Sequence, residues 1–479
     1  MKVLIHALSQ VSSKFLTKLL GFFAFTLMVK YLGTEGYGRY SYVLAFVSFF
    51  AMFADMGLNA NLFKDASKRP GQAPKQLGQS LLLEGLLLPL LVTVVAFAAL
   101  FMEQDHKLWV FIVLAAVGTY SRTLSQAFIQ VFNGREHFHL TAVIDFIESA
   151  INLALVALVV WQNWHISGLL LMLAIKHALV LIVNMVMYFW KRYRLTWSFD
   201  LREIRHLMWM AMPFVVIGAL NNVYQQVDII MLKHMTNFEE VGSYGSAYRL
   251  LTFVFLIGST LAGVAFPQLA QRSNQMDTRF FRFFNLSGRM LTYASVLITV
   301  NCVAGGQGIM RLLFGSSFNY AGVIFVVLSL SVTINFFALI PTYTLVAIEA
   351  LWQYALVYVF SVAGNVFFNW LAIPRWQAIG ASAATIFTEF ITIIIVYVYV
   401  RRRLHVPAMF SLSRGLGFGL VTVISVGAAF YWRRLDLWWA IPGASLTFLT
   451  LFFAFRILNA EDWEWLLRMR GQFKFSGRG

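Results

Sequence analysis

Residues 14–57 read KFLTKLLGFFAFTLMVKYLGTEGYGRYSYVLAFVSFFAMFADMG, and this stretch decides the fold class. Two apolar segments of helical length flank a short glycine-rich turn, which predicts a helical hairpin. Lys14 and Lys18 lie four residues apart on one face of the first helix, and Asp55 lies inside the second. Such apolar helices predict two membrane spans whose charged side chains face something other than lipid.

The composition extends this conclusion to the whole chain. Of the 479 residues, 59% are hydrophobic and only 12% are charged, and the mean hydropathy is +0.72. The apolar runs are mostly about 20 residues or longer, which is the length of a membrane-crossing helix. None alternates with the period of two of an outer-membrane barrel strand. The sequence therefore predicts an all-α integral membrane protein that keeps its first helix. The single cysteine excludes a disulfide framework.

The apolar runs predict about fourteen transmembrane helices. They lie near residues 8–30, 38–62, 78–101, 108–132, 139–161, 167–190, 207–232, 243–268, 288–313, 320–345, 352–373, 378–400, 411–431 and 436–457. About 23 basic residues lie in the connections and termini of one side and about 8 on the other. We expect both termini in the cytoplasm by the positive-inside rule. The same rule explains the net charge of +16, and no nucleic-acid partner is expected.

A short element occurs twice along the chain. EGYGRYS (35–41) and EVGSYGS (240–246) each place a glycine two residues before a tyrosine, with an offset of 204. Six spans separate the copies, so both have the same membrane orientation, as in a parallel transporter repeat. We expect two pseudo-symmetric six-helix lobes, two appended helices and a basic, aromatic tail that contacts membrane lipids. The expected ranges are 1–200, 201–402, 403–460 and 461–479.

Basic side chains inside the spans are candidates for an anion site, because a charge at the bilayer centre is costly unless it faces protein or water. Lys14 and Lys18 either reach lipid phosphates or form one wall of a cationic cavity. Arg122 either lines such a cavity or pairs with Asp145 or Glu148.

The acidic side chains in the spans have two interpretations as well. Asp145 and Glu148 lie three residues apart on one helix face. They either share a proton for ion coupling or are neutralised by Arg122 or Lys176. Asp55 serves either helix packing or ion coupling. Asp228 is a further candidate for ion coupling, and Glu84 is expected near the cytoplasmic rim.

No catalytic or metal-binding motif occurs in the sequence. It contains neither a G-x-x-x-x-G-K-[ST] loop nor an H-E-x-x-H motif. We therefore expect no enzyme, no cofactor and no metal. A gradient, the membrane potential or the substrate's own concentration must drive any transport.

Four stretches resemble one transporter family. They are YLGTEGYGRYSYVLAFVSFFAMFADMGL (31–58), MPFVVIGALNNVYQQVDIIML with VGSYGSAYRLL (212–251), LLFGSSFNYAGVIFVVLSLS (312–331) and NVFFNWLAIPRWQAIGASAATIFTEF (365–390). They are similar to polysaccharide flippases, the Wzx-type transporters of the multidrug/oligosaccharidyl-lipid/polysaccharide exporter superfamily. The resemblance covers the chain to about residue 402.

The resemblance implies two lobes that work by alternating access on an undecaprenyl-diphosphate-linked oligosaccharide in the bacterial inner membrane. Lys14, Lys18, Arg122 and Arg249 are the cations available for the diphosphate. A polysaccharide polymerase and glycosyltransferases are the expected partners, and a monomer is the expected state. Two alternatives are a cation-coupled multidrug exporter on the same scaffold and a non-transporting scaffold of a polysaccharide assembly complex.

Overall fold

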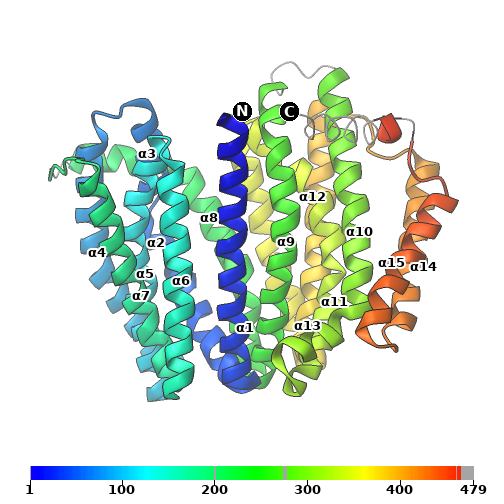
Figure 1. Ribbon diagram of the computed structural model, residues 1–479, viewed down its shortest axis with the longest axis horizontal. Coiled ribbons are helices and arrows are strands. Elements are labelled where there is room, and N and C mark those ends of the chain that lie inside the picture. Colours follow the sequence, from blue (N-terminus) through cyan, green and yellow to red (C-terminus); the bar gives the residue numbers. More distant parts are fainter. Residues whose placement is uncertain (1, 199–200, 273–277, 460, 465–479) are drawn as a thin grey trace. The chain divides into compact units, whose positions relative to one another are not determined.

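The structure is a computed structural model that describes residues 2–198, 201–272, 278–459 and 461–464. All secondary structure in these ranges is helical (Figure 1). The elements are α1 (Lys2–Phe50), α2 (Met52–Asp55), α3 (Leu58–Lys68), α4 (Ala73–Met102), α5 (His106–Gly134), α6 (Phe138–Gln162), α7 (His165–Trp190), α8 (Leu201–Met235), α9 (Phe238–Arg272), α10 (Thr278–Phe314), η1 (Ser316–Phe318), α11 (Asn319–Ser329), α12 (Ser331–Ala347), α13 (Leu351–Leu404), α14 (Leu412–Trp432) and α15 (Leu437–Ala454). The predicted all-α fold is confirmed.

Twelve helices in the described ranges are long and apolar enough to cross a membrane. Two of them contain a sharp kink, at Gly33 in α1 and at Gln377 in α13. Gly33 has a φ of 68°, which glycine adopts readily because it has no Cβ. Each kink lies between two predicted spans. Helix α13 therefore contains two predicted spans, and α1 contains the first predicted span and the beginning of the second, so twelve helices cover about fourteen predicted spans.

The second predicted span, residues 38–62, is not one continuous helix, and this corrects the sequence prediction. Helix α1 ends at Phe50, and the single turn of α2 ends at Asp55. Met56 and Gly57 then take left-handed backbone conformations, with φ of 47° and 76°. Two such residues in succession end the helix, and only Gly57 adopts this conformation without steric cost. Asp55 therefore lies at a break in the span.

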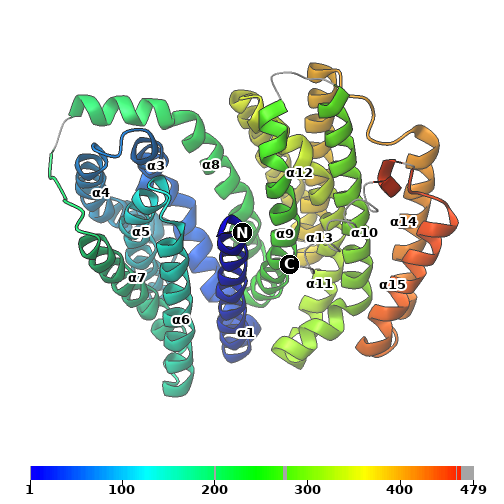
Figure 2. The ribbon, with the colours of Figure 1, turned by 45° about the horizontal axis from the view of Figure 1, so that its top comes forward.

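Residue contacts divide the chain into two compact units, and the boundary lies between Gly242 and Ser243. In the first unit, α5 is the central helix and packs against α7, α4, α3 and α1. Gly118 permits its close approach to α7, because a Cβ there would lie 3.0 Å from the backbone nitrogen of Ala174. Helix α8 contacts α1 and α3, and it bends along its length (Figure 2). The lobe boundary at residue 200 stays a prediction.

In the second unit, α10 is the helix around which the others assemble. It packs against α11, α12, α14 and α15, and its Val296, Val300 and Val303 are fully buried in the core with α14 and α15. The last two helices form an antiparallel pair beside α10 (Figure 1). The two C-terminal helices are thus an integral part of this unit.

Candidate functional site

The cations predicted for an anion site lie on three helices. Lys18 lies on α1, Arg122 near the middle of α5 and Arg249 on α9, and each side chain is exposed on the surface of its own unit. Among the described residues, none of the three forms an ion pair with a carboxylate. Lys14 belongs to α1, but its side chain lies outside the described residues.

Packing on the opposite side of α5 explains why Arg122 is exposed. Tyr120 is buried and donates a hydrogen bond to the backbone oxygen of Val47 on α1, at 3.0 Å. Tyr120 is two positions before Arg122, so its contact with α1 lies on the opposite side of α5 and leaves Arg122 exposed. An unpaired guanidinium at the middle of a membrane-crossing helix offers five N–H donors to water or to an anionic ligand.

Glu148 is neutralised by Lys176, as one of the two sequence interpretations predicted. The Nζ atom of Lys176 on α7 lies 3.8 Å from Oε1 of Glu148 on α6, and both side chains are mostly buried. Asp145 is partly buried one turn earlier on α6. Because Glu148 has a cationic partner in its own unit, its charge is offset without a transported ion.

The break at Met56 and Gly57 brings a second acidic pair together. Asp55 Oδ1 accepts a hydrogen bond of 2.9 Å from the backbone N–H of Asn59, in the first turn of α3. The side-chain amide of Asn59 donates to Oε1 of Glu84 on α4, at 3.3 Å. Glu84 is 1% exposed, so its side chain lies in the interior of the unit, and its place near the cytoplasmic rim stays a prediction. An asparagine therefore bridges two carboxylates.

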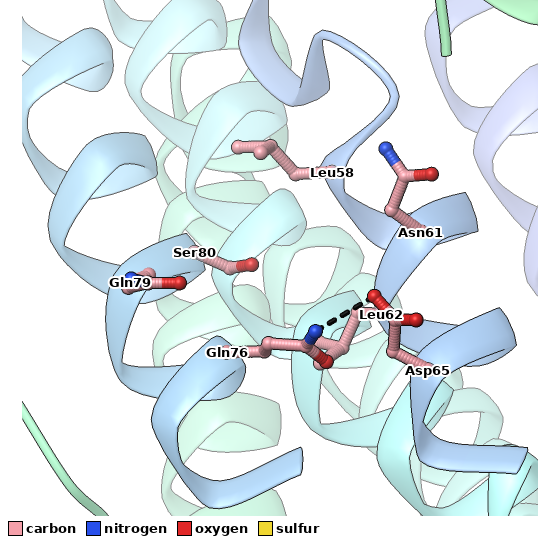
Figure 3. Close-up of a pocket in the computed structure, with 7 residues that line it drawn as sticks. All are labelled: Leu58, Asn61, Leu62, Asp65, Gln76, Gln79 and Ser80. Atoms are coloured by element: carbon pink, nitrogen blue, oxygen red, sulfur yellow. Dashed lines mark hydrogen bonds between the residues drawn. The ribbon is translucent and has the colours of Figure 1, made fainter. Parts of the chain in front are cut away.

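A small polar pocket lies beside this cluster, between α3 and α4 (Figure 3). Its free space is about 10 Å³, which is room for about one water molecule. At one end the side-chain amide of Gln76 donates to Asp65 Oδ2, at 2.7 Å. The pocket is lined by Leu58, Asn61, Leu62, Asp65, Gln76, Gln79 and Ser80. It is far too small for a saccharide and is suited to water.

A third charged cluster lies between α4, α1 and α8. Lys233 Nζ lies 2.6 Å from Oε2 of Glu103, whose other oxygen accepts a hydrogen bond from the hydroxyl of Tyr42. His234 lies edge-on to the Tyr42 ring. The sequence did not reveal this cluster, because Glu103 and Lys233 are far apart in the chain and both end apolar runs. Asp228, the further acidic candidate, is buried on α8.

These features define the class of protein. Kinked and broken helices that are long and apolar enough to cross a membrane, a repeated element, and charged side chains on those helices are features of a secondary transporter. A family model described as "Polysaccharide biosynthesis protein" matches residues 3–273, which is more than half of the chain. The chain belongs to this family.

Known relatives agree with this assignment. Capsular polysaccharide biosynthesis protein CapF from Staphylococcus aureus is 18% identical over 391 residues, which are 79% of this chain and 95% of that protein. The lipid II flippase MurJ in an inward closed conformation has a TM-score of 0.74 at 14% identity, over 94% of this chain and 98% of that chain. An inward-facing multidrug resistance MATE family transporter of the MOP superfamily has a TM-score of 0.66 at 11% identity, over 81% and 94%. The predicted membership of a polysaccharide biosynthesis family is confirmed by the family model, and the two solved structures show that the chain shares their fold.

Proposed function

We propose that this chain is a flippase for an undecaprenyl-diphosphate-linked oligosaccharide in surface polysaccharide biosynthesis. It moves the lipid from the inner to the outer leaflet of the bacterial inner membrane by alternating access, with both termini in the cytoplasm. Family membership and the flippase and transporter folds of its structural relatives support a lipid-linked substrate. Glycosyltransferases would supply that substrate, and a polymerase would consume it.

The observation that carries the proposal is the exposed, unpaired guanidinium of Arg122 on a membrane-crossing helix. A diphosphate has several oxygen acceptors, and guanidinium groups bind such acceptors by charge-assisted, bidentate hydrogen bonds. Lys18 and Arg249 present further exposed cations on their own units. These cations favour an anionic substrate over the cationic drugs of a multidrug exporter. The pairing of Glu148 with Lys176 also leaves one carboxylate fewer for a cationic drug.

The test uses purified protein in vesicles and a fluorescent undecaprenyl-diphosphate saccharide. Loss of a charge-assisted hydrogen bond costs about 1.5–3 kcal/mol, so Arg122→Ala should slow translocation by about 10- to 100-fold. Arg122→Lys should recover part of the rate, because it keeps the charge. The unmodified protein should translocate diphosphate lipids faster than monophosphate lipids, and this difference in rate should be smaller in Arg122→Ala.

The matched control is Arg279→Ala, which removes an exposed arginine from the first turn of α10. Arg135 would be a poor control, because it donates to the backbone oxygen of Pro70 at 2.7 Å and lies over the Tyr193 ring. Equal rates for Arg122→Ala and Arg279→Ala would eliminate the cationic-site mechanism. Failure of the unmodified protein to move any prenyl-diphosphate lipid would contradict the flippase function.

A further inference from the structure

The broken second span contains two carboxylates in different surroundings. Asp55 accepts the backbone N–H of Asn59, where the free N–H groups at the start of α3 favour a negative charge. Glu84 is 1% exposed, and among the described residues it accepts a 3.3 Å hydrogen bond from the Asn59 amide. A negative charge on Asp55 would have a backbone N–H donor, whereas the buried Glu84 accepts, within the described ranges, only from the Asn59 side chain, so Glu84 is the less favourable of the two places for a negative charge.

Two buried oxygen atoms at this cluster lack a hydrogen bond. Among the described residues, neither Glu84 Oε2 nor Asn59 Oδ1 has a partner. Both side chains are more than nine-tenths buried, with exposures of 1% and 9%. An unsatisfied buried acceptor costs free energy, and two on side chains that already touch indicate a missing donor. The existing bond joins the Asn59 side-chain nitrogen to Glu84 Oε1. The two atoms without a partner are the other polar atoms of the same amide and the same carboxyl group.

We propose that Glu84 binds one proton and is held as a neutral carboxylic acid while Asp55 remains ionised. A proton on Oε2 makes Glu84 a donor toward the free oxygen of Asn59, and the amide of Asn59 continues to donate to Oε1. One proton thereby satisfies both unpartnered atoms in a cyclic acid–amide pair. It also removes the second negative charge from an interior where an unpaired ion is costly. This site is independent of the proposed substrate.

The donor groups favour a proton over a metal cation as the occupant. Metal ions such as Na⁺ would require several oxygen ligands around one point, as hard cations do. At this cluster N–H groups are directed at both carboxylates, from the backbone and the side chain of Asn59. Among the described residues, no three His, Cys, Asp or Glu side chains form a metal-binding group.

The pocket in Figure 3 begins at Ser80, one helical turn from Glu84, and we propose it as the route of the proton to water. Glu84, Ser80 and Gln76 are four residues apart along α4 and so lie on one helix face. Ser80 and Gln76 line the pocket together with Asp65 from α3, and the space holds about one water molecule. The short turn at residues 69–72 joins α3 and α4 at this end. Basic residues on this connection predict that the proton exchanges with the cytoplasmic side.

Infrared spectroscopy of the purified, full-length protein at neutral pH tests the proposal. The spectrum should contain the carbonyl stretching band of a buried protonated carboxyl group. Glu84→Gln should remove this band, whereas Glu148→Gln, in an ion-paired carboxylate, should leave it. Asn59→Leu should shift the band, because the acid would lose its acceptor. Ser80→Leu should keep the band and slow its shift in heavy water, because it fills the route.

Stability measurements keep the proposal falsifiable. Glu84→Gln should retain the melting temperature of the unmodified protein, because glutamine reproduces a neutral group that donates to Asn59. A band that survives Glu84→Gln with the fold intact would overturn the proposal. A band that is absent from the unmodified protein, together with a melting temperature raised by Na⁺ and not by choline, would assign the site to a metal cation instead.

Discussion

Gly38 on α1 and Gly242 on α9 contact each other reciprocally. A Cβ built on Gly38 would overlap the backbone oxygen of Phe238 and lie 2.9 Å from the nitrogen of Gly242. A Cβ built on Gly242 would overlap the backbone oxygen of Thr34 and lie 2.9 Å from the nitrogen of Gly38. Both pairs, Thr34 with Phe238 and Gly38 with Gly242, are 204 positions apart. The repeated element thus forms a local two-fold contact of one copy with the other.

The first prediction concerns this helix crossing. Gly38→Ala should separate α1 from α9, because the atoms that the new methyl group meets belong to the backbone and cannot rotate away. We expect a loss of about 1–3 kcal/mol, seen as a lower melting temperature in detergent. Gly242→Ala should cause a similar loss. The double variant should lose less than the sum, because both methyl groups open the same contact.

Gly21→Ala is the matched control on the same helix, since a Cβ there has no neighbour within 4 Å. Alanine favours helix more than glycine does, so this variant should be as stable as the unmodified protein or slightly more stable. Equal melting temperatures for Gly38→Ala and Gly21→Ala would refute the close crossing.

The second prediction concerns the buried ion pair of Lys233 and Glu103. Their side chains are 17% and 3% exposed, and the Lys233 ammonium also lies 5.0 Å from the centre of the Tyr42 ring. Glu103→Gln should cost about 3–5 kcal/mol, because it leaves the lysine charge buried without a carboxylate. Adding Lys233→Met should restore part of the stability. Chemical or thermal unfolding of the three variants measures the coupling as a double-mutant cycle.

An exposed ion pair in the same unit provides the comparison. Arg39 lies 2.9 Å from Glu35, with exposures of 36% and 57%. Glu35→Gln should cost less than about 1 kcal/mol, because water already solvates both charges. An equally small loss of stability in Glu103→Gln and Glu35→Gln would show that burial does not strengthen the contribution of the Lys233–Glu103 pair to stability.

The sequence predicted the parts of this fold that depend on local pattern. Apolar run lengths located the crossings, and the spacing of Gly38 and Tyr40 against Gly242 and Tyr244 revealed the repeat. The apolar pattern did not predict the break at Met56, because a methionine in a left-handed conformation has the same hydropathy as one in a helix. The break consists of two successive residues in left-handed backbone conformations, which a periodic pattern does not contain.

The candidate site was less accessible to sequence reasoning, because charge pairs join residues from distant elements. Lys176 was one of two possible partners for Glu148, and only the packing of α6 against α7 selects it. Glu84 follows a leucine-rich run near the start of a span, so its position indicated a rim. Its burial comes with the packing of α3 against α4, which the position of Glu84 in the sequence does not reveal.

The third prediction concerns His137, which precedes α6. Its Nδ1 atom lies 2.8 Å from the Tyr193 hydroxyl, and burial lowers the pKa of its ring below 6.5, with smaller contributions from the charges of Lys191, His139 and Arg135. Between the lowered pKa and 6.5 the unfolded chain binds more protons than the folded one, so this group stabilises the fold above that range. The melting temperature should therefore fall as the pH drops below about 6.5. His137→Gln should flatten the dependence of the melting temperature on pH. An unchanged slope in this variant would refute the role of His137 in that dependence.

The fourth prediction concerns the segment after α15, which Asp462 anchors to α10. Asp462 is fully buried and lies 2.9 Å from Arg289, which also donates to the backbone oxygen of Met409. Asp462→Asn should weaken this anchor by up to about 3 kcal/mol, because the buried Arg289 would keep only its pair with the half-exposed Glu461, at 3.3 Å. Tryptic cleavage at Arg456 requires local opening of the segment, so its rate should rise by up to about 100-fold. Glu464→Gln, in an exposed pair with Arg282, is the control and should change the rate little. Equal cleavage rates for the two variants would show that the segment is held by something other than Asp462.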